Sequence, residues 1–169
     1  MSADIIHRHL PDGPRDQVPR RIVVHAMGYR IRTDNGVMYA ASFLESIGLS
    51  AHVLVAPDGT RIRCRSDTEG AWHARGYNDD SLGIEVLVDG VHDYGSFTER
   101  IQTPWVHKAQ LESAIDQVAE WCVRWDIPPE PGTLDEHSTL DPDRKVDPGE
   151  GFPWAEFVRR VKGSMGKFT

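Results

Sequence analysis

The sequence predicts a single-domain α/β fold in which a mixed central β-sheet is flanked by helices. The chain has 169 residues, a usual size for one domain with its own core. Strand-like and helix-like segments alternate along it without an internal repeat. Hydrophobic residues make up 39% and charged residues 27%, which is typical of a soluble globular protein and argues against disorder.

Two β-rich segments lie in the first half of the chain. Residues 20–27 form a short run rich in β-branched side chains, which predicts a buried strand with His25 near its end. Residues 50–66 predict a β-hairpin, because two strand-like runs flank Asp58-Gly59 and this dipeptide favours the positive φ of a tight turn. The hairpin is the clearest local signal in the sequence.

Three segments have helical spacing of their apolar residues. Residues 36–48 predict a helix with one apolar face, made of Val37, Ala40, Ala41, Leu44 and Ile47. A longer helix is predicted over residues 103–126, with Thr103 as N-cap and Pro104 at the first helical position. Its apolar stripe contains Leu111, Ile115, Val118, Cys122 and Trp125. Residues 153–163 predict a short closing helix that ends at a glycine.

The remaining segments are a strand and two connections. Residues 81–90 predict a further strand, in which Gly83 indicates a close backbone approach. Residues 127–137 contain three prolines and predict a loop. Residues 89–103 carry no motif that we can assign. We therefore expect an N-terminal extension over residues 1–19, one domain over residues 20–163 and a short tail over residues 164–169.

Charge and composition narrow the classes of partner. The net charge of −7 argues against nucleic acid and against anionic membrane surfaces. Apolar runs fall short of the roughly 20 residues that span a bilayer, and residues 1–13 lack the apolar stretch of a secretory signal. Cys64 and Cys122 lie far apart and are expected to be buried free thiols. We expect a cytoplasmic monomer that binds neither nucleic acid nor membrane.

A candidate metal site lies in the polar segment EHSTLDPDRKVDPG, residues 136–149. Zinc in a hydrolase takes about three protein ligands and leaves one position open for water. His25, His137 and Asp147 can supply such a set, and a metal would explain an imidazole at the end of an apolar strand. Spacing alone specifies a metal only weakly, because a strand-end His is commonly hydrogen-bonded structure and an Asp before Pro148 commonly forms a turn.

Several motifs in order resemble a known family. They are IVVH ending at His25, SAHVLVAPDGT at residues 50–60, AWHARGYNDDSLGIEV at residues 71–86, and His137 followed by KVDPG at residues 145–149 and FPW. Together they resemble the zinc-dependent N-acetylmuramoyl-L-alanine amidases, the amidase type 2 or peptidoglycan-recognition fold. The similarity covers residues 20–160.

The resemblance implies a role for each matching residue. His25, His137 and Asp147 match the ligands of one zinc ion per chain, which would make water nucleophilic near neutral pH. Glu85 matches an acidic residue near that water and would act as general base and then general acid. Lys145 matches a lysine two residues before the last ligand and would stabilise the charge on the carbonyl oxygen. Alternatively, Glu85 faces solvent and Lys145 is a solvated loop charge.

Three further positions bear on the resemblance. His73 and Asn78 match a segment that lines the substrate groove, although a packed loop residue is an even alternative for His73. His52, inside a hairpin strand, is expected to support the core or the metal ligands. Single-domain phage members often carry a tyrosine and a third-ligand cysteine where this chain has Ala51 and Asp147. These departures increase the expected dependence on Glu85.

The resemblance implies hydrolysis of the amide bond between N-acetylmuramic acid and L-alanine in peptidoglycan. The expected setting is that of a phage or prophage endolysin, a bacteriolytic enzyme that degrades the cell wall after the membrane is permeabilised. One alternative is a cytosolic amidase that recycles anhydro-muropeptides. The other is a peptidoglycan-binding module without catalytic activity.

Overall fold

The computed structural model describes residues 5–15, 18–29 and 36–169, and it confirms the mixed α/β architecture. Within these residues a six-stranded sheet has the order β1-β4-β3-β5-β2-β6. The strands are β1 (Ile5–His7), β2 (Arg21–Tyr29), β3 (Val53–Val55), β4 (Arg61–Arg63), β5 (Ser81–Val91) and β6 (Leu134–Glu136). The helices are α1 (Gly36–Ser46), α2 (Tyr94–Arg100), α3 (Lys108–Trp125), α4 (His137–Leu140) and α5 (Trp154–Ser164), followed by the 3-10 turn η1 (Met165–Lys167).

The sheet is mixed because its two halves run in opposite directions. β3, β5, β2 and β6 run parallel to one another, whereas β4 runs antiparallel to β3. β1 pairs with β4 in parallel at the edge. The predicted hairpin is confirmed: Gly59 has a φ of 90°, and the backbone N–H of Thr60 donates to Asp58 Oδ1 at 2.8 Å.

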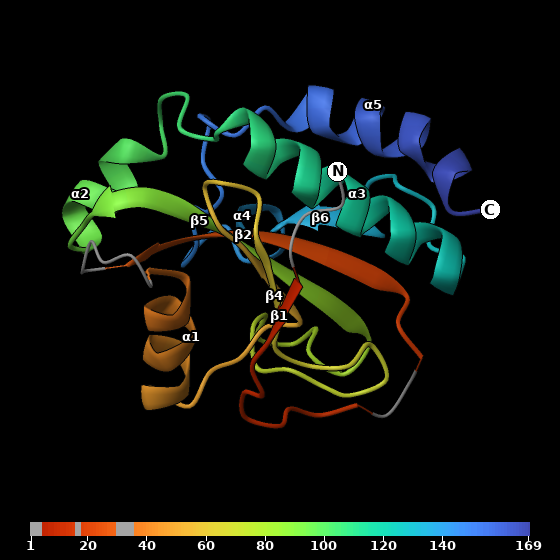
Figure 1. Cartoon of the computed structure of the whole chain (residues 1–169), viewed down its shortest axis with the longest axis horizontal. Helices are drawn as coiled ribbons and strands as arrows, with labels where there is room; N and C mark the ends of the chain where they lie inside the picture. Colours follow the sequence, from red (N-terminus) through yellow and green to blue (C-terminus); the bar gives the residue numbers. More distant parts are fainter. Residues whose placement is uncertain (1–4, 16–17, 30–35) are drawn as a thin grey trace.

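Helices cover both faces of the sheet (Figure 1). α3 and α5 lie side by side on one face, while α1 stands on the other. Alternate side chains of β2 and β5 pack under α3 and α5, namely Ile22, Val24, Ala26, Leu82, Ile84, Val86 and Val88. Met27 and Leu87 belong to the second cluster, which contains Ala40, Ala41 and Leu44 of α1. Because successive strand residues point to opposite faces, His25 and Glu85 lie on the α1 face.

Local signals placed one helix boundary wrongly. α3 begins at Lys108 rather than at Thr103, and its N-cap is His107. The side-chain oxygen of Gln110 accepts the backbone N–H of His107 at 3.4 Å. Gln110 also donates to the carbonyl oxygens of Val55 and Leu87, so contacts with the sheet fix the first turn.

The sequence analysis missed two short elements. It assigned no motif to residues 89–103 and predicted a loop over residues 127–137. The first segment contains α2, and the second contains β6. β1 falls within the predicted extension 1–19. Residues 1–4 and 16–17 of this extension lie outside the described part of the chain. The side chain of Val37, which was predicted on the apolar face of the first helix, also lies outside the described part. In the part of the chain that the structure describes, no helix has the length and apolar character needed to cross a bilayer.

Candidate active site

A pocket of about 350 Å³ opens on the α1 face beside β2 and β5. Polar groups of its lining come from β2, from the loop before β5, from β5 and from the segment after β6. They are His25, His73, Glu85, His137, Lys145 and Asp147. Exposed apolar side chains also line it, namely Ile47, Leu49, Trp72, Tyr94 and Val146. Ile47 was expected on the apolar face of the first helix, but it follows the last turn of α1 and is 49% exposed.

The parallel strands bring distant residues to one place. His25 on β2 pairs in register with Glu85 on β5. On the other side of β2, Val24 pairs with Glu136, and His137 follows directly as the first residue of α4. The backbone N–H of Ser138 donates to the carbonyl oxygen of Asp147 at 2.9 Å, which holds the later loop against α4.

His25, His137 and Asp147 converge on one point. The Nδ1 atoms of the two histidines are 2.9 Å apart, and they lie 3.3 and 3.1 Å from Asp147 Oδ2. All three residues are buried. Ligands bound tetrahedrally to zinc at roughly 2.0–2.2 Å lie about 3.3 Å from one another, so the spacing fits a zinc ion. Two imidazole lone pairs and a carboxylate facing one another also require a proton or a cation between them.

The protonation of this group suits a metal. Burial lowers the pKa of His25 to about 4, so its imidazole is neutral near pH 7. Burial alone would raise the pKa of Asp147, but hydrogen bonds with His137 and His25 hold it below its usual range. A neutral imidazole and an ionised carboxylate are the forms that coordinate metal ions.

Glu85 lies inside the pocket wall rather than in solvent. It is buried, and its Oε1 is 3.9 Å from His25 Nδ1. Burial raises its pKa well above the usual value, and the negative charge of Asp147 raises it further, while Lys145 acts in the opposite direction. The solvent-facing alternative is therefore wrong, and Glu85 lies in the pocket lining beside the candidate metal site.

Lys145 lies beside the candidate ligands. Lys145, Val146 and Asp147 all line the pocket, and the backbone N–H of Lys145 donates to the carbonyl oxygen of Asp141 at 2.9 Å. In the described lining, Lys145 is the sole lysine or arginine. Its positive charge therefore acts on the neighbouring His25 and Glu85.

His73 and Asn78 occupy different positions. His73 lines the pocket, but its Nδ1 lies 2.9 Å from His25 Nε2 and its Nε2 lies 2.9 Å from Ser81 Oγ. Asn78 is not part of the described lining; its Oδ1 accepts the backbone N–H groups of His73 and Ala74 at 2.9 and 2.8 Å. Contact of either side chain with substrate stays a prediction.

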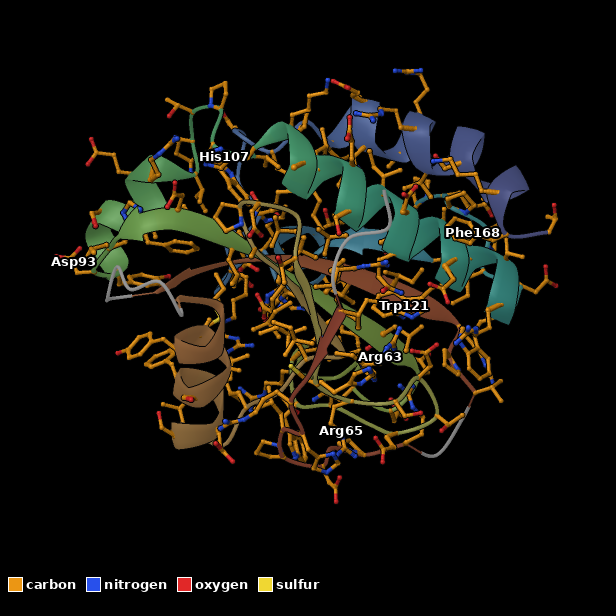
Figure 2. The ribbon with its side chains drawn as sticks, in the orientation of Figure 1. Arg63, Arg65, Asp93, His107, Trp121 and Phe168 are labelled. Carbon is orange, nitrogen blue, oxygen red and sulfur yellow. The ribbon has the colours of Figure 1, made fainter. Side chains whose placement is uncertain are left out.

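The α2 segment supplies pocket residues that the sequence reasoning missed. His92, Asp93, Tyr94 and Phe97 line the pocket from the end of β5 and from α2. Asp93 is labelled in Figure 2, at the left of the view beside α2. Its Oδ1 accepts the backbone N–H of Ser96 at 2.8 Å, which makes it the N-cap of α2. Aspartate is one of the residues preferred at the N-cap, so Asp93 was the available signal for a helix start.

Comparison with known proteins identifies the family. A family model described as N-acetylmuramoyl-L-alanine amidase matches residues 15–150, which include His25, Glu85, His137 and Asp147. The chain belongs to this amidase family. The match confirms the resemblance seen in the sequence motifs.

Individual relatives of the amidase span almost the whole chain. The 1,6-anhydro-N-acetylmuramyl-L-alanine amidase AmpD of Enterobacter cloacae is 28% identical over 187 residues, covering 95% of this chain and 92% of that protein. The enzyme of the same name from Escherichia coli strain K12 is 27% identical over 171 residues, covering 88% and 86%.

Solved structures share the fold. N-acetylmuramoyl-L-alanine amidase LysC from Clostridium intestinale URNW superposes with a TM-score of 0.67 at 21% identity, covering 94% of this chain and 97% of that one. A selenomethionine derivative of AmpD superposes with a TM-score of 0.70 at 22% identity, covering 95% and 94%. Both are similar to this amidase in the arrangement of the whole domain.

Proposed function

We propose that this protein is a zinc-dependent amidase that cleaves the bond between the lactyl group of N-acetylmuramic acid and the L-alanine of the stem peptide. The observation that carries the proposal is the convergence of His25 Nδ1, His137 Nδ1 and Asp147 Oδ2 within 3.3 Å of one another. When bound, zinc lowers the pKa of water and polarises a carbonyl oxygen, which amide hydrolysis requires. The family match supports this donor set.

Glu85 carries the protons in this proposal. Burial raises its pKa well above the usual value, and a carboxylate with a raised pKa is a stronger base than an exposed glutamate. It takes one proton from the attacking water and delivers it to the nitrogen of the leaving L-alanine. Water thus supplies the hydroxyl group of the lactyl acid and a hydrogen of the released amine.

Lys145 stabilises the developing charge. Attack on the amide places negative charge on the carbonyl oxygen, and an ammonium group in the pocket lining lowers the energy of that state. The other charged side chains of the described lining, Glu85, Asp93 and Asp147, are acidic. Lys145 is therefore the residue of the described lining whose charge has the required sign.

Two settings fit this chemistry. An endolysin would cut polymeric peptidoglycan in the wall, whereas a recycling enzyme would cut soluble anhydro-muropeptides. The solved endolysin LysCS from Clostridium intestinale URNW and a mutant endolysin from Bacillus subtilis have the same fold, while the curated relatives are named for the anhydro substrate. We propose the endolysin setting with recycling as the alternative. Turnover of intact sacculi against anhydro-muropeptides separates them, and strong preference for the soluble substrate rejects the endolysin.

The test of catalysis is release of stem peptide from purified muropeptides. We expect mass spectrometry to detect free peptides with an N-terminal L-alanine when zinc is supplied, and their loss when zinc is chelated. A peptidoglycan-binding module without activity would bind muropeptides and release nothing in either condition. That outcome would reject the enzyme.

A further inference from the structure

The imidazole of His73 lies directly behind His25, on the side away from the candidate metal site. His25 Nε2 is 2.9 Å from His73 Nδ1, and the two rings meet edge to face with centroids 5.1 Å apart. His73 Nε2 is in turn 2.9 Å from the Oγ of Ser81, which is fully buried. A continuous chain of polar contacts therefore leads from a candidate ligand to β5.

The direction in which the hydrogen bonds run from His25 through His73 to Ser81 is linked to metal binding. A neutral imidazole has one N–H group and one bare nitrogen, and the neighbours decide which is which. If His25 Nδ1 is bare for a metal, Nε2 carries the proton and donates to His73 Nδ1. His73 then carries its own proton on Nε2 and donates to Ser81 Oγ. The reverse direction would place a proton on His25 Nδ1 and block the metal.

The protein holds the His73 ring firmly in this position. A Cβ at Gly83 would lie 2.5 Å from His73 Nδ1, so the ring occupies the space that a side chain on β5 would need. The close backbone approach predicted at Gly83 is thus made by an imidazole. Asn78 Oδ1 fixes the backbone of the His73 loop through two hydrogen bonds. None of these contacts requires a substrate.

We propose that His73 is a positioning residue, which holds His25 in the tautomer and orientation that bind the metal. This inference rests on the proposed zinc site and assigns His73 a role other than the expected substrate contact. A hydrogen-bonded partner of a metal-ligating histidine typically contributes about 10–100-fold to metal affinity. His73 contributes through His25, and Ser81 completes the chain.

The experiment measures zinc affinity of the full chain by competition with a chromophoric chelator. His73→Phe keeps a ring over Gly83 but removes the acceptor, and we expect zinc affinity to fall by about 10–100-fold. His73→Asn places an amide oxygen near the former Nδ1 position and should restore most of the loss. His92→Asn is the matched control, because His92 lines the same pocket and contacts the carbonyl oxygen of Asp89; its zinc affinity should equal that of the wild type.

Two further readouts separate positioning from a general structural role. Long-range ¹H–¹⁵N spectra should show the proton of His25 on Nε2 in the wild-type zinc form, and at saturating zinc His73→Phe should change KM little. Unchanged zinc affinity in a folded His73→Phe protein, with a raised KM, would overturn the inference in favour of substrate contact. Failure of the wild type itself to bind zinc would instead reject the proposed function.

Discussion

His52 is buried in surroundings that accept only its neutral form. Its Nδ1 accepts the backbone N–H of Gly83 at 3.0 Å, and its Nε2 lies 2.9 Å from the carbonyl oxygen of Glu69. A second proton on Nδ1 would face the Gly83 N–H, and a positive ring would face the Arg15 guanidinium, whose Nη2 is 3.0 Å from Nε2. Burial, with a smaller contribution from Arg15, lowers the pKa of His52 to about 3.

This shift predicts a loss of stability in acid. The pKa in the unfolded chain is 6.5, so below that pH the unfolded state binds a proton that the folded state binds only near pH 3. The stability linked to His52 is therefore complete above pH 6.5 and is lost progressively as the pH falls toward 3. One pH unit corresponds to about 1.4 kcal/mol, so acidification from pH 6.5 to about 4.5 costs about 3 kcal/mol at this residue.

The assay compares the wild type with His52→Asn, whose amide oxygen can accept the Gly83 N–H but does not titrate. Free energies of unfolding in urea are measured on the metal-free proteins, so that metal release does not contribute. We expect the wild type to be the more stable protein near pH 7, and the difference to shrink by about 3 kcal/mol near pH 4.5. A difference that stays constant across this range would refute the reasoning.

Four further predictions concern the pocket and its support. Glu85→Gln lowers amide turnover by about 10²–10⁴-fold in a muropeptide assay, because proton transfer is lost, while zinc content by metal analysis is unchanged. Lys145→Met lowers kcat by about 10²–10³-fold in steady-state kinetics, because charge stabilisation is lost. Asp147→Ala removes both bound zinc and peptide release, since an anionic ligand is missing. Asp67→Asn lowers the free energy of unfolding in urea by about 3 kcal/mol, because the buried carboxylate accepts hydrogen bonds from Arg63 and from two indole N–H groups.

Three of these predictions have a control variant or a stated contradicting outcome. Loss of zinc from Glu85→Gln would identify Glu85 as a ligand instead of a base. Lys108→Met removes an exposed lysine on α3, outside the described pocket lining, and should leave kcat unchanged. Asp143→Asn alters an exposed aspartate and should leave stability unchanged; an equal effect at Asp67 and Asp143 would contradict the buried network. Figure 2 labels Arg63 of β4 and Trp121 of α3, which both donate to Asp67 Oδ1.

Local sequence signals predicted the long helices and strands. They failed where tertiary contacts determine the start of a helix or the formation of a short strand. The strand around residues 20–27 and the hairpin at Asp58-Gly59 depend on neighbouring residues, so their pattern is visible in the chain. The start of α3 depends on Gln110 reaching two carbonyl oxygens of the sheet, which no local pattern encodes. β6 has three residues and forms through pairing with β2, as at Ile22 and Leu134.

The candidate site shows the same division. The motifs named His25, His137 and Asp147 as a ligand set, although 112 positions separate the two histidines, because the order of motifs along the chain resembles the family. From the sequence, Glu85 could either face solvent or lie at the site, because the alternation of side chains along β5 does not show which face of the sheet carries the pocket. The α2 residues of the pocket were missed because they form a wall without belonging to a motif.

Register is the physical link between the core and the chemistry. A slip of one residue in the pairing of β2 with β5 would turn every side chain of the slipped strand to the other face. Glu85 would then face α3 and α5, and Ile84 would enter the pocket. The buried apolar side chains at Ile22, Val24, Ile84 and Val86 oppose such a slip, because it would expose them beside polar groups. The register that this packing fixes also places Glu85 beside His25, on the opposite face of the sheet, where burial raises the pKa of the Glu85 carboxyl group.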